Sequence, residues 1–168
     1  MSLDALEKEL AIRKMLAVSS DCVWRKALDE YGACWANDGE WRIMGLVVNG
    51  REAIKATWGQ FMDALKTAWQ VTPNMVIEVD GEVGYGRLYI QETLQQPDGS
   101  VNVMRGIYHD TYKIEDSKWV FAKRHIDIVY MGPADMSGRF YETVPYGPAP
   151  RDANADRPAT PSMAEAYG

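Results

Sequence analysis

Residues 101–131 constrain the fold of this chain more than any other segment. The run VNVMRGIYHDTYKIEDSKWVFAKRHIDIVYM predicts two long neighbouring strands joined by a polar turn at residues 115–118. An ordinary half-buried strand alternates apolar residues with polar residues that face water. Here aromatic, basic and acidic side chains occupy both faces, and both histidines of the chain lie within the segment. Each face of this sheet must therefore meet a polar environment, either solvent or a lined cavity.

Turn signals extend this pair into a four-stranded antiparallel meander. Asp80-Gly81 and Asp98-Gly99 are typical of hairpin turns. The predicted strands are residues 70–79, 82–94, 101–113 and 119–130. Three helices precede them, one from a cap at Ser2 or Asp4 to about Ser20, one over residues 21–35 and one over residues 51–67, with a turn at 37–39 and a short strand at 40–44. This order predicts an α+β fold with the helices on one face of an antiparallel sheet.

Size and composition indicate one globular domain in a reduced compartment. The 168 residues, 46% of them hydrophobic, can form a proper core. No apolar run approaches the ~20 residues that cross a bilayer, and the charged N-terminus has no secretory signal. Cys22 and Cys34 do not suggest a disulfide framework or a zinc site, which favours a cytoplasmic protein. A net charge of -6 argues against nucleic acid as a partner.

The composition changes after residue 131. Residues 132–168 are rich in Pro, Gly, Ala and Asp, which is typical of disorder. We expect a domain at 1–131 and a C-terminal tail at 132–168 that packs on the same or a neighbouring subunit through Phe140, Tyr141, Val144 and Tyr146. The tail, and an outer sheet face that carries Arg105 and His109, favour a homodimer or homotrimer.

Several short motifs recur at a recognisable spacing between residues 5 and 131. They are Ile12-Arg13, Asp38 to Trp41, Gly50 to Ile54, Gly106 to Tyr112 and Trp119 to Arg124. Their order resembles the SnoaL-like family of the nuclear-transport-factor-two-like superfamily. The resemblance implies a cone, in which a curved sheet wraps around the three N-terminal helices. It also implies cofactor-free lyase chemistry, as in scytalone dehydratase and hexachlorocyclohexane dehydrochlorinase, which carry an aspartate–histidine pair inside the cone.

That aspartate–histidine pair does not carry over to this chain. The aspartate falls at or near Trp24 and the histidine at Gln70, and neither side chain titrates as an acid or base. The nearest carboxylate is Asp21, one helical turn earlier on a similar face. The resemblance further places a pocket arginine at Arg124 and pocket-lining side chains at Trp41, Tyr89, Gln91, Met104 and Tyr108.

The candidate site combines these residues with the alternation of the strands. We expect Asp21 or His125 as the base, Tyr108 and Tyr89 as hydrogen-bond donors and Arg124 as the anchor for an anionic oxygen. Alternation places His125 and His109 on the face opposite Arg124, so His125 reaches the pocket only across a β-bulge. The predicted catalytic residues are Asp21, Tyr108, Arg124 and His125, and the predicted substrate-binding residues are Trp24, Tyr31, Trp41, Gln70, Tyr89, Gln91 and Met104.

Each assignment has a plainer structural alternative. Asp21 suits an N-cap or an exposed carboxylate, Arg124 suits a structural ion pair, and tyrosines suit a core. The pattern contains no metal-binding motif, and we expect no cofactor. The leading hypothesis is a cofactor-independent lyase that dehydrates a small phenolic compound, with retro-aldol loss of formaldehyde as a second route. The alternatives are a non-catalytic small-molecule-binding protein and the small structural subunit of an aromatic-ring dioxygenase.

Overall fold

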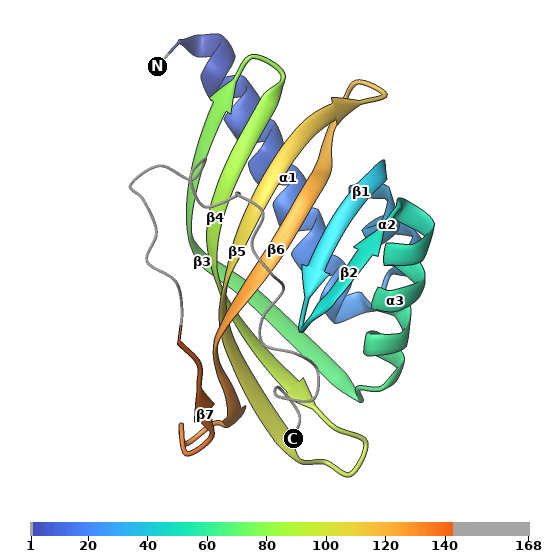
Figure 1. Cartoon of the computed structure of the whole chain (residues 1–168), viewed down its shortest axis with the longest axis vertical. Coiled ribbons are helices and arrows are strands. Elements are labelled where there is room, and N and C mark those ends of the chain that lie inside the picture. Colours follow the sequence, from blue (N-terminus) through green and yellow to red (C-terminus); the bar gives the residue numbers. More distant parts are fainter. Residues whose placement is uncertain (1, 143–168) are drawn as a thin grey trace.

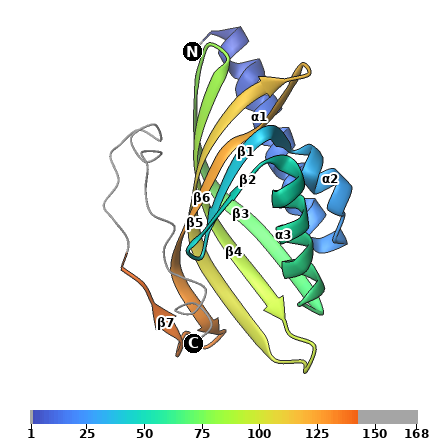
Figure 2. The ribbon, with the colours of Figure 1, turned by 45° about the vertical axis from the view of Figure 1, so that its right-hand side comes forward.

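The computed structural model describes residues 2–142. Three helices lie against one face of a single curved sheet, which wraps partly around them (Figure 1, Figure 2). The elements are α1 (Leu3–Arg25), α2 (Leu28–Ala33), β1 (Trp35–Ile43), β2 (Leu46–Asn49), α3 (Arg51–Asp63), β3 (Thr67–Asp80), β4 (Val83–Gln95), β5 (Val101–Glu115), β6 (Lys118–Pro133) and β7 (Arg139–Phe140). This is the predicted α+β cone.

The sheet contains the predicted meander and one parallel junction. Its strand order is β2-β1-β6-β5-β4-β3, with β7 paired to β6. All pairs from β3 to β6 are antiparallel, as the turns predict. The pair β1–β6 is parallel, with Trp41 opposite Arg124. The whole sheet is therefore mixed, and the expectation of a purely antiparallel sheet holds only for the meander.

The first strand begins earlier than its sequence predicts. Asn37-Asp38-Gly39 has the composition of a turn, yet it lies within β1, where the register against β6 shifts between Trp35 and Glu40. The Glu115 carboxylate accepts a hydrogen bond from the backbone N–H of Asn37 at 3.2 Å. Glu115 also pairs with Arg51, which donates to the Trp35 carbonyl. These tertiary contacts hold an extended conformation against the local turn preference.

The first helix continues through the segment where a break was expected. Ser2 caps it, as predicted, and it runs to Arg25. The Ser19 hydroxyl donates to the Leu16 carbonyl at 2.8 Å, so this polar side chain is satisfied inside the helix. Lys26, with φ of 52°, ends the helix in the left-handed region. The second helix is consequently short and starts only at Leu28.

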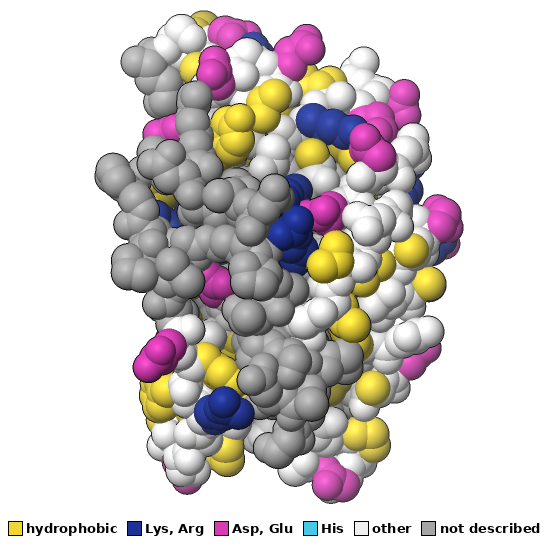
Figure 3. Space-filling model, in the orientation of Figure 1, with side chains coloured by type: hydrophobic (Ala, Val, Ile, Leu, Met, Phe, Trp, Pro, Cys, Tyr) yellow, Lys and Arg dark blue, Asp and Glu magenta, His cyan; other side chains and the backbone are white. Residues whose placement is uncertain are grey.

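The core lies between the concave face of the sheet and the helices. Ile12 and Leu16 from α1, Leu88 from β4 and Ile126 from β6 are all buried there. None of the described helices is long and apolar enough to span a bilayer. On the face drawn in Figure 3, acidic and basic side chains are interspersed over the described surface.

The start of the C-terminal segment contacts the domain. The Phe140 ring packs 4.8 Å from that of Tyr130, and the backbone N–H of Tyr141 donates to the Val129 carbonyl at 3.0 Å. Val144 and Tyr146, the other expected anchors, lie outside the described residues.

Candidate functional site

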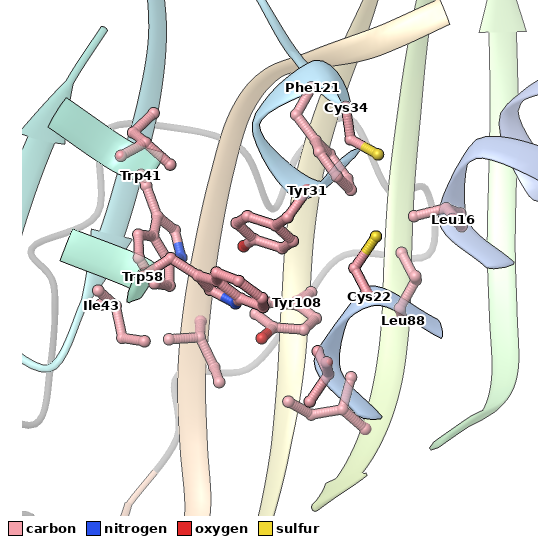
Figure 4. Close-up of a cluster of buried hydrophobic side chains, with 14 of the residues drawn as sticks. Leu16, Cys22, Tyr31, Cys34, Trp41, Ile43, Trp58, Leu88, Tyr108 and Phe121 are labelled. Carbon is pink, nitrogen blue, oxygen red and sulfur yellow. The ribbon is translucent and has the colours of Figure 1, made fainter. Parts of the chain in front are cut away.

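A cavity lies between the concave face of the sheet and the three helices. It contains about 690 Å³ of unfilled space, counting the part that opens to solvent. Most of its lining is aromatic or aliphatic, and Figure 4 shows the rings of Trp41, Trp58, Tyr31 and Tyr108 gathered around the same space. A cavity with a mostly apolar lining and a few polar groups is typical of a small-molecule site. The polar side chains that line it are Tyr31, Gln70, Glu92, Tyr108 and Arg124.

Glu92 is the only carboxylate among the described residues that line the cavity. It lies on β4 on the same face as the buried residues Leu88, Ile90 and Leu94. The side-chain amide of Gln70, on the neighbouring strand β3, donates to Glu92 at 2.5 Å. Burial raises the pKa of Glu92, against the opposing effects of the Gln70 hydrogen bond and the Arg124 charge. Glu92 can therefore hold or release a proton nearer to neutrality than an exposed glutamate.

Gln70 connects three polar side chains, which are those of Ser20, Glu92 and Tyr108. Its Oε1 accepts a hydrogen bond from the Ser20 hydroxyl of α1 at 3.1 Å. Its Nε2 contacts both Glu92 and the Tyr108 hydroxyl, the latter at 3.5 Å. Because Ser20 engages the amide oxygen, the amide nitrogen faces the cavity. The position where the family resemblance places a histidine thus holds an oriented amide that cannot titrate.

Arg124 is buried in a bidentate ion pair. Its Nε and Nη2 donate to Asp110 at 2.8 and 2.7 Å, and the Tyr112 hydroxyl donates to the same carboxylate at 2.9 Å. The guanidinium lies between two rings, 3.9 Å from the centroids of both Tyr108 and Phe121. Burial alone would lower the pKa of Arg124, but Asp110 more than compensates and raises it. Arg124 is therefore a fixed cation at the cavity wall.

The space for this pair depends on a glycine of the neighbouring strand. A Cβ atom at Gly86 of β4 would collide with the Tyr112 hydroxyl. The bare backbone lets the Tyr112 ring lie across β4 while its hydroxyl reaches Asp110. Packing around Gly86 thus fixes the carboxylate that orients Arg124.

The two cavity tyrosines stay protonated. Burial raises the pKa of Tyr31, and burial together with the charge of Glu92 raises the pKa of Tyr108 well above its usual value. Tyr31 stacks on Trp58 with ring centroids 4.2 Å apart and an interplanar angle of 11°. Both hydroxyls can therefore serve as hydrogen-bond donors rather than as bases.

Four of the predicted site residues lie outside the cavity. Asp21 is exposed and pairs with Arg25 at 2.7 Å. Trp24 is 56% exposed and packs against Trp69 on the outside of the fold. Tyr89 and Gln91 belong to the β4 face opposite Glu92 and are both exposed. The structure therefore does not bring a base from α1 into the site.

His125 also lies away from the cavity. The β5–β6 register shifts on both sides of it, between Thr111 and Tyr112 and between Arg105 and Gly106, yet the stretch between these shifts keeps its alternation. His125 is paired in register with His109 on the convex face, and Nε2 of His109 lies 3.2 Å from Asp127. The β5–β6 pair does contain register shifts, but none lies between His125 and its neighbour Arg124. His125 therefore stays on the face opposite Arg124.

The predicted residues that do meet in one cavity are Tyr31, Trp41, Gln70, Met104, Tyr108 and Arg124. Glu92 is the candidate that the sequence reasoning missed. The signal was available, because Leu88, Ile90 and Leu94 alternate as apolar residues and Glu92 shares their face. Within residues 2–142 there is no group of three or more His, Cys, Asp or Glu side chains that could hold a metal ion.

Solved structures with the same fold include a candidate dehydratase and a dehydrochlorinase. A candidate scytalone dehydratase from Novosphingobium aromaticivorans is 19% identical, with 84% of this chain and 96% of that chain covered and a TM-score of 0.73. A hexachlorocyclohexane dehydrochlorinase, LinA type 2, is 17% identical, with 82% and 95% covered and a TM-score of 0.70. At these identities the likeness establishes the fold.

A third structural neighbour bears a different description. A candidate aromatic ring hydroxylase from Novosphingobium aromaticivorans is 15% identical, with 76% of this chain and 93% of that chain covered and a TM-score of 0.71. No curated protein matches the sequence. The SnoaL-like domain matches residues 4–125, which is most of the chain and includes every polar side chain of the cavity. The chain therefore belongs to the SnoaL-like family.

Proposed function

We propose that the protein is a cofactor-independent lyase that removes water from a small phenolic compound. The observation that carries this proposal is the pair of opposed groups in one aromatic cavity. Glu92, a carboxyl with a raised pKa, and the cationic Arg124 both line this cavity. Elimination by this route needs both, because the phenol must be held as its anion, whose electrons expel the leaving group, while a proton moves at the side chain.

Arg124 binds the phenol as its phenolate, and the phenol proton is released to solvent water. Asp110 engages Nε and Nη2, and Nη1 has no hydrogen bond to any residue in the described range. Arg124 is buried and lines the cavity, and a fixed cation in such surroundings stabilises an oxyanion more than it does in bulk water. The phenolate then pushes electrons through the ring and expels a benzylic hydroxyl group.

Glu92 serves first as the acid and then as the base. Protonated Glu92 gives its proton to the departing hydroxyl, so the C–O bond breaks, water leaves and the ring becomes a quinone methide. Glu92, now a carboxylate, takes a proton from the neighbouring carbon. The electrons of that C–H bond form the side-chain double bond and restore the aromatic phenolate. Glu92 ends protonated, as it began, and the Gln70 amide holds its carboxyl group in place.

Loss of formaldehyde is the second route in the same site. When the neighbouring carbon carries a hydroxymethyl group, Glu92 takes the proton of that hydroxyl instead. The C–C bond breaks, its electrons form the double bond, and the carbon leaves as formaldehyde. Both routes use the same groups, so the substrate's side chain decides between them.

Ultraviolet assays on a panel of hydroxybenzyl-type phenolic alcohols test this function, because the product double bond conjugates with the ring. We expect Glu92→Gln to lower kcat by about 10²–10⁴-fold, the usual contribution of a positioned acid or base. Glu82→Gln, at an exposed glutamate in the turn before β4, is the matched control and should retain full activity. Full turnover by Glu92→Gln would exclude Glu92 as the acid–base group.

The second candidate is a non-catalytic binding protein. It is favoured because neither of the positions discussed for the family pair, Trp24 and Gln70, holds a titratable side chain. Phenols that bind with micromolar affinity and are never turned over would support it. The small subunit of a dioxygenase would need a large iron-binding partner, whereas we propose a homodimer or homotrimer, which sedimentation of the purified chain can distinguish.

A further inference from the structure

The indole nitrogen of Trp41 is a buried donor with no acceptor within residues 2–142. Trp41 lies on β1, is 2% exposed and lines the cavity. Its Nε1 has no hydrogen-bond partner among the described residues. Buried polar groups are nearly always paired, because an unpaired donor costs about 1–3 kcal/mol. Figure 4 shows this nitrogen on the side of the ring that faces Trp58 and Tyr108.

Trp41 lies beside Arg124 in the sheet. Trp41 and Arg124 are register partners of the parallel pair β1–β6, and both side chains line the cavity. An indole N–H and a guanidinium N–H can only donate hydrogen bonds. We call Trp41 and Arg124 the donor end of the cavity. It selects a group that only accepts hydrogen bonds, and a phenolate oxygen is such a group.

Tyr108 contacts both Arg124, at the donor end, and the Gln70 amide that bonds to Glu92. Its ring centroid is 3.9 Å from Cζ of Arg124, and its hydroxyl is 3.5 Å from the Gln70 nitrogen that contacts Glu92. Arg124 therefore contacts the face of the Tyr108 ring, and Glu92 is linked to the hydroxyl of the same ring through Gln70. A ligand whose oxygen binds the donor end presents the opposite side of its own ring to Glu92.

We propose that Trp41 determines specificity by donating a hydrogen bond to the substrate's phenolate oxygen, and that the substrate is a para-substituted phenol. The orientation rests on the proposed function, since it places the reacting side chain at Glu92. Chemistry supports the same position, because phenolate electrons reach a benzylic carbon only from the ortho or para position. A para substituent lies farther from the phenol oxygen than an ortho one, which suits Arg124 and Glu92 because they are linked through Tyr108 and Gln70 rather than by a direct contact.

Binding of unreactive ligands tests this inference separately from turnover. The probes are 4-ethylphenol, 2-ethylphenol and 4-ethyltoluene, which lacks the oxygen. On the wild-type protein we expect 4-ethylphenol to bind at least about tenfold more tightly than either other probe, the value of one good hydrogen bond to a charged group. We also expect the bound 4-ethylphenol to show the phenolate absorption band. Equal binding of 2-ethylphenol and 4-ethylphenol would overturn the para assignment.

Trp41→Phe separates the hydrogen bond from the bulk of the indole. It should weaken 4-ethylphenol about tenfold more than it weakens 4-ethyltoluene. Trp58→Phe removes an indole from the same cavity and should weaken the two ligands equally. Equal losses of both ligands in Trp41→Phe would overturn the donor role. If that variant does not fold, the wild-type comparison of the three probes still decides the para assignment, and Trp41→Leu, which also lacks the N–H, replaces it as the test of the donor role. If the probes behave as expected but no phenolic alcohol is turned over, the lyase proposal fails and the binding orientation stands.

Discussion

The two faces of the β5–β6 pair carry similar charged groups in different surroundings. On the concave face, Asp110 pairs with Arg124. One residue away on the convex face, His109 is the register partner of His125, and both histidines approach Asp127, at 3.2 and 3.4 Å. All five side chains are buried. Burial and charge alone therefore do not identify a functional site in this sheet.

The difference between the faces is the cavity. Arg124 touches Tyr108, whose hydroxyl reaches Gln70 and thus the candidate acid–base group Glu92. The convex cluster has no member that lines this cavity. Alternation along two strands thus separates a network that can contact a ligand from one that joins the strands to each other. Substitutions on each face should separate the two roles.

The largest expected effect is that of Arg124→Met on the concave face. It leaves the Asp110 carboxylate buried without its cation, which typically costs about 3–5 kcal/mol. We expect a correspondingly lower free energy of unfolding, measured by urea titration, and loss of phenol binding. The double variant Asp110→Asn with Arg124→Met should recover most of the stability but not the binding. Recovery of binding as well would show that Arg124 is only structural.

Asp127→Asn makes the matching change on the convex face. It removes the anion beside His109 and His125, and we expect a cost of about 1–3 kcal/mol. Because Asp127 does not line the cavity, kcat/KM toward phenolic alcohols should stay at the wild-type value. A large loss of kcat/KM with intact folding would mean that the two faces are coupled and that the comparison is wrong.

The sequence predicts the fold better than it predicts the site. Turn residues such as Asp80-Gly81 and Asp98-Gly99 act locally, so the meander follows from them directly. Site membership depends on which face of an element turns inward. On β4 the aromatic Tyr89 suggests one face, while the apolar positions show that the face of Glu92 is the inner one.

The α1 helix gives the second example of this limit. Ser19-Ser20-Asp21 reads as a helix break, and a break there would have changed which side chains of the following segment turn inward. The helix instead continues, so Val23 lines the cavity and Trp24 is exposed. The hydrogen bonds of Ser19 and Ser20 that allow this are made to Leu16 and to Gln70, and the latter comes from a strand far along the chain.

The pH dependence of the stability of Glu92→Gln is a further test of the concave face. Burial raises the pKa of folded Glu92, so the folded protein holds this proton more tightly than the unfolded chain does. Below the ordinary value of 4.5 the carboxyl is protonated in both states and has no net effect. As the pH rises from there to the folded-state pKa, the unfolded chain ionises first and stability falls.

The glutamine cannot ionise and avoids this loss. Glu92→Gln should therefore be more stable than the wild type at about pH 8, and the difference should disappear at about pH 4. Melting temperatures across this range measure it, with Glu82→Gln as the control at an exposed site. A difference that grows as the pH falls would contradict the raised pKa.

The smallest expected effect is that of Ser20→Ala. The Ser20 hydroxyl holds Oε1 of Gln70, and its loss should cost about 0.5–1.5 kcal/mol of stability. Without this bond the Gln70 amide can rotate and no longer directs Nε2 at Glu92. The Gln70 hydrogen bond opposes the rise in the pKa of Glu92. Its loss should therefore move the Glu92 limb of the pH–rate profile to higher pH.

Ser19→Ala is the matched control, one residue earlier on the same helix. Its hydroxyl bonds only within α1, to the Leu16 carbonyl, so its removal should lower stability without moving the pH–rate profile. A purely structural role for Ser20 predicts the same behaviour in both variants. A shift in Ser20→Ala alone would show that a helix residue outside the cavity tunes the acid–base group through one amide. Identical profiles in the two variants would restrict the candidate site to the side chains that line the cavity.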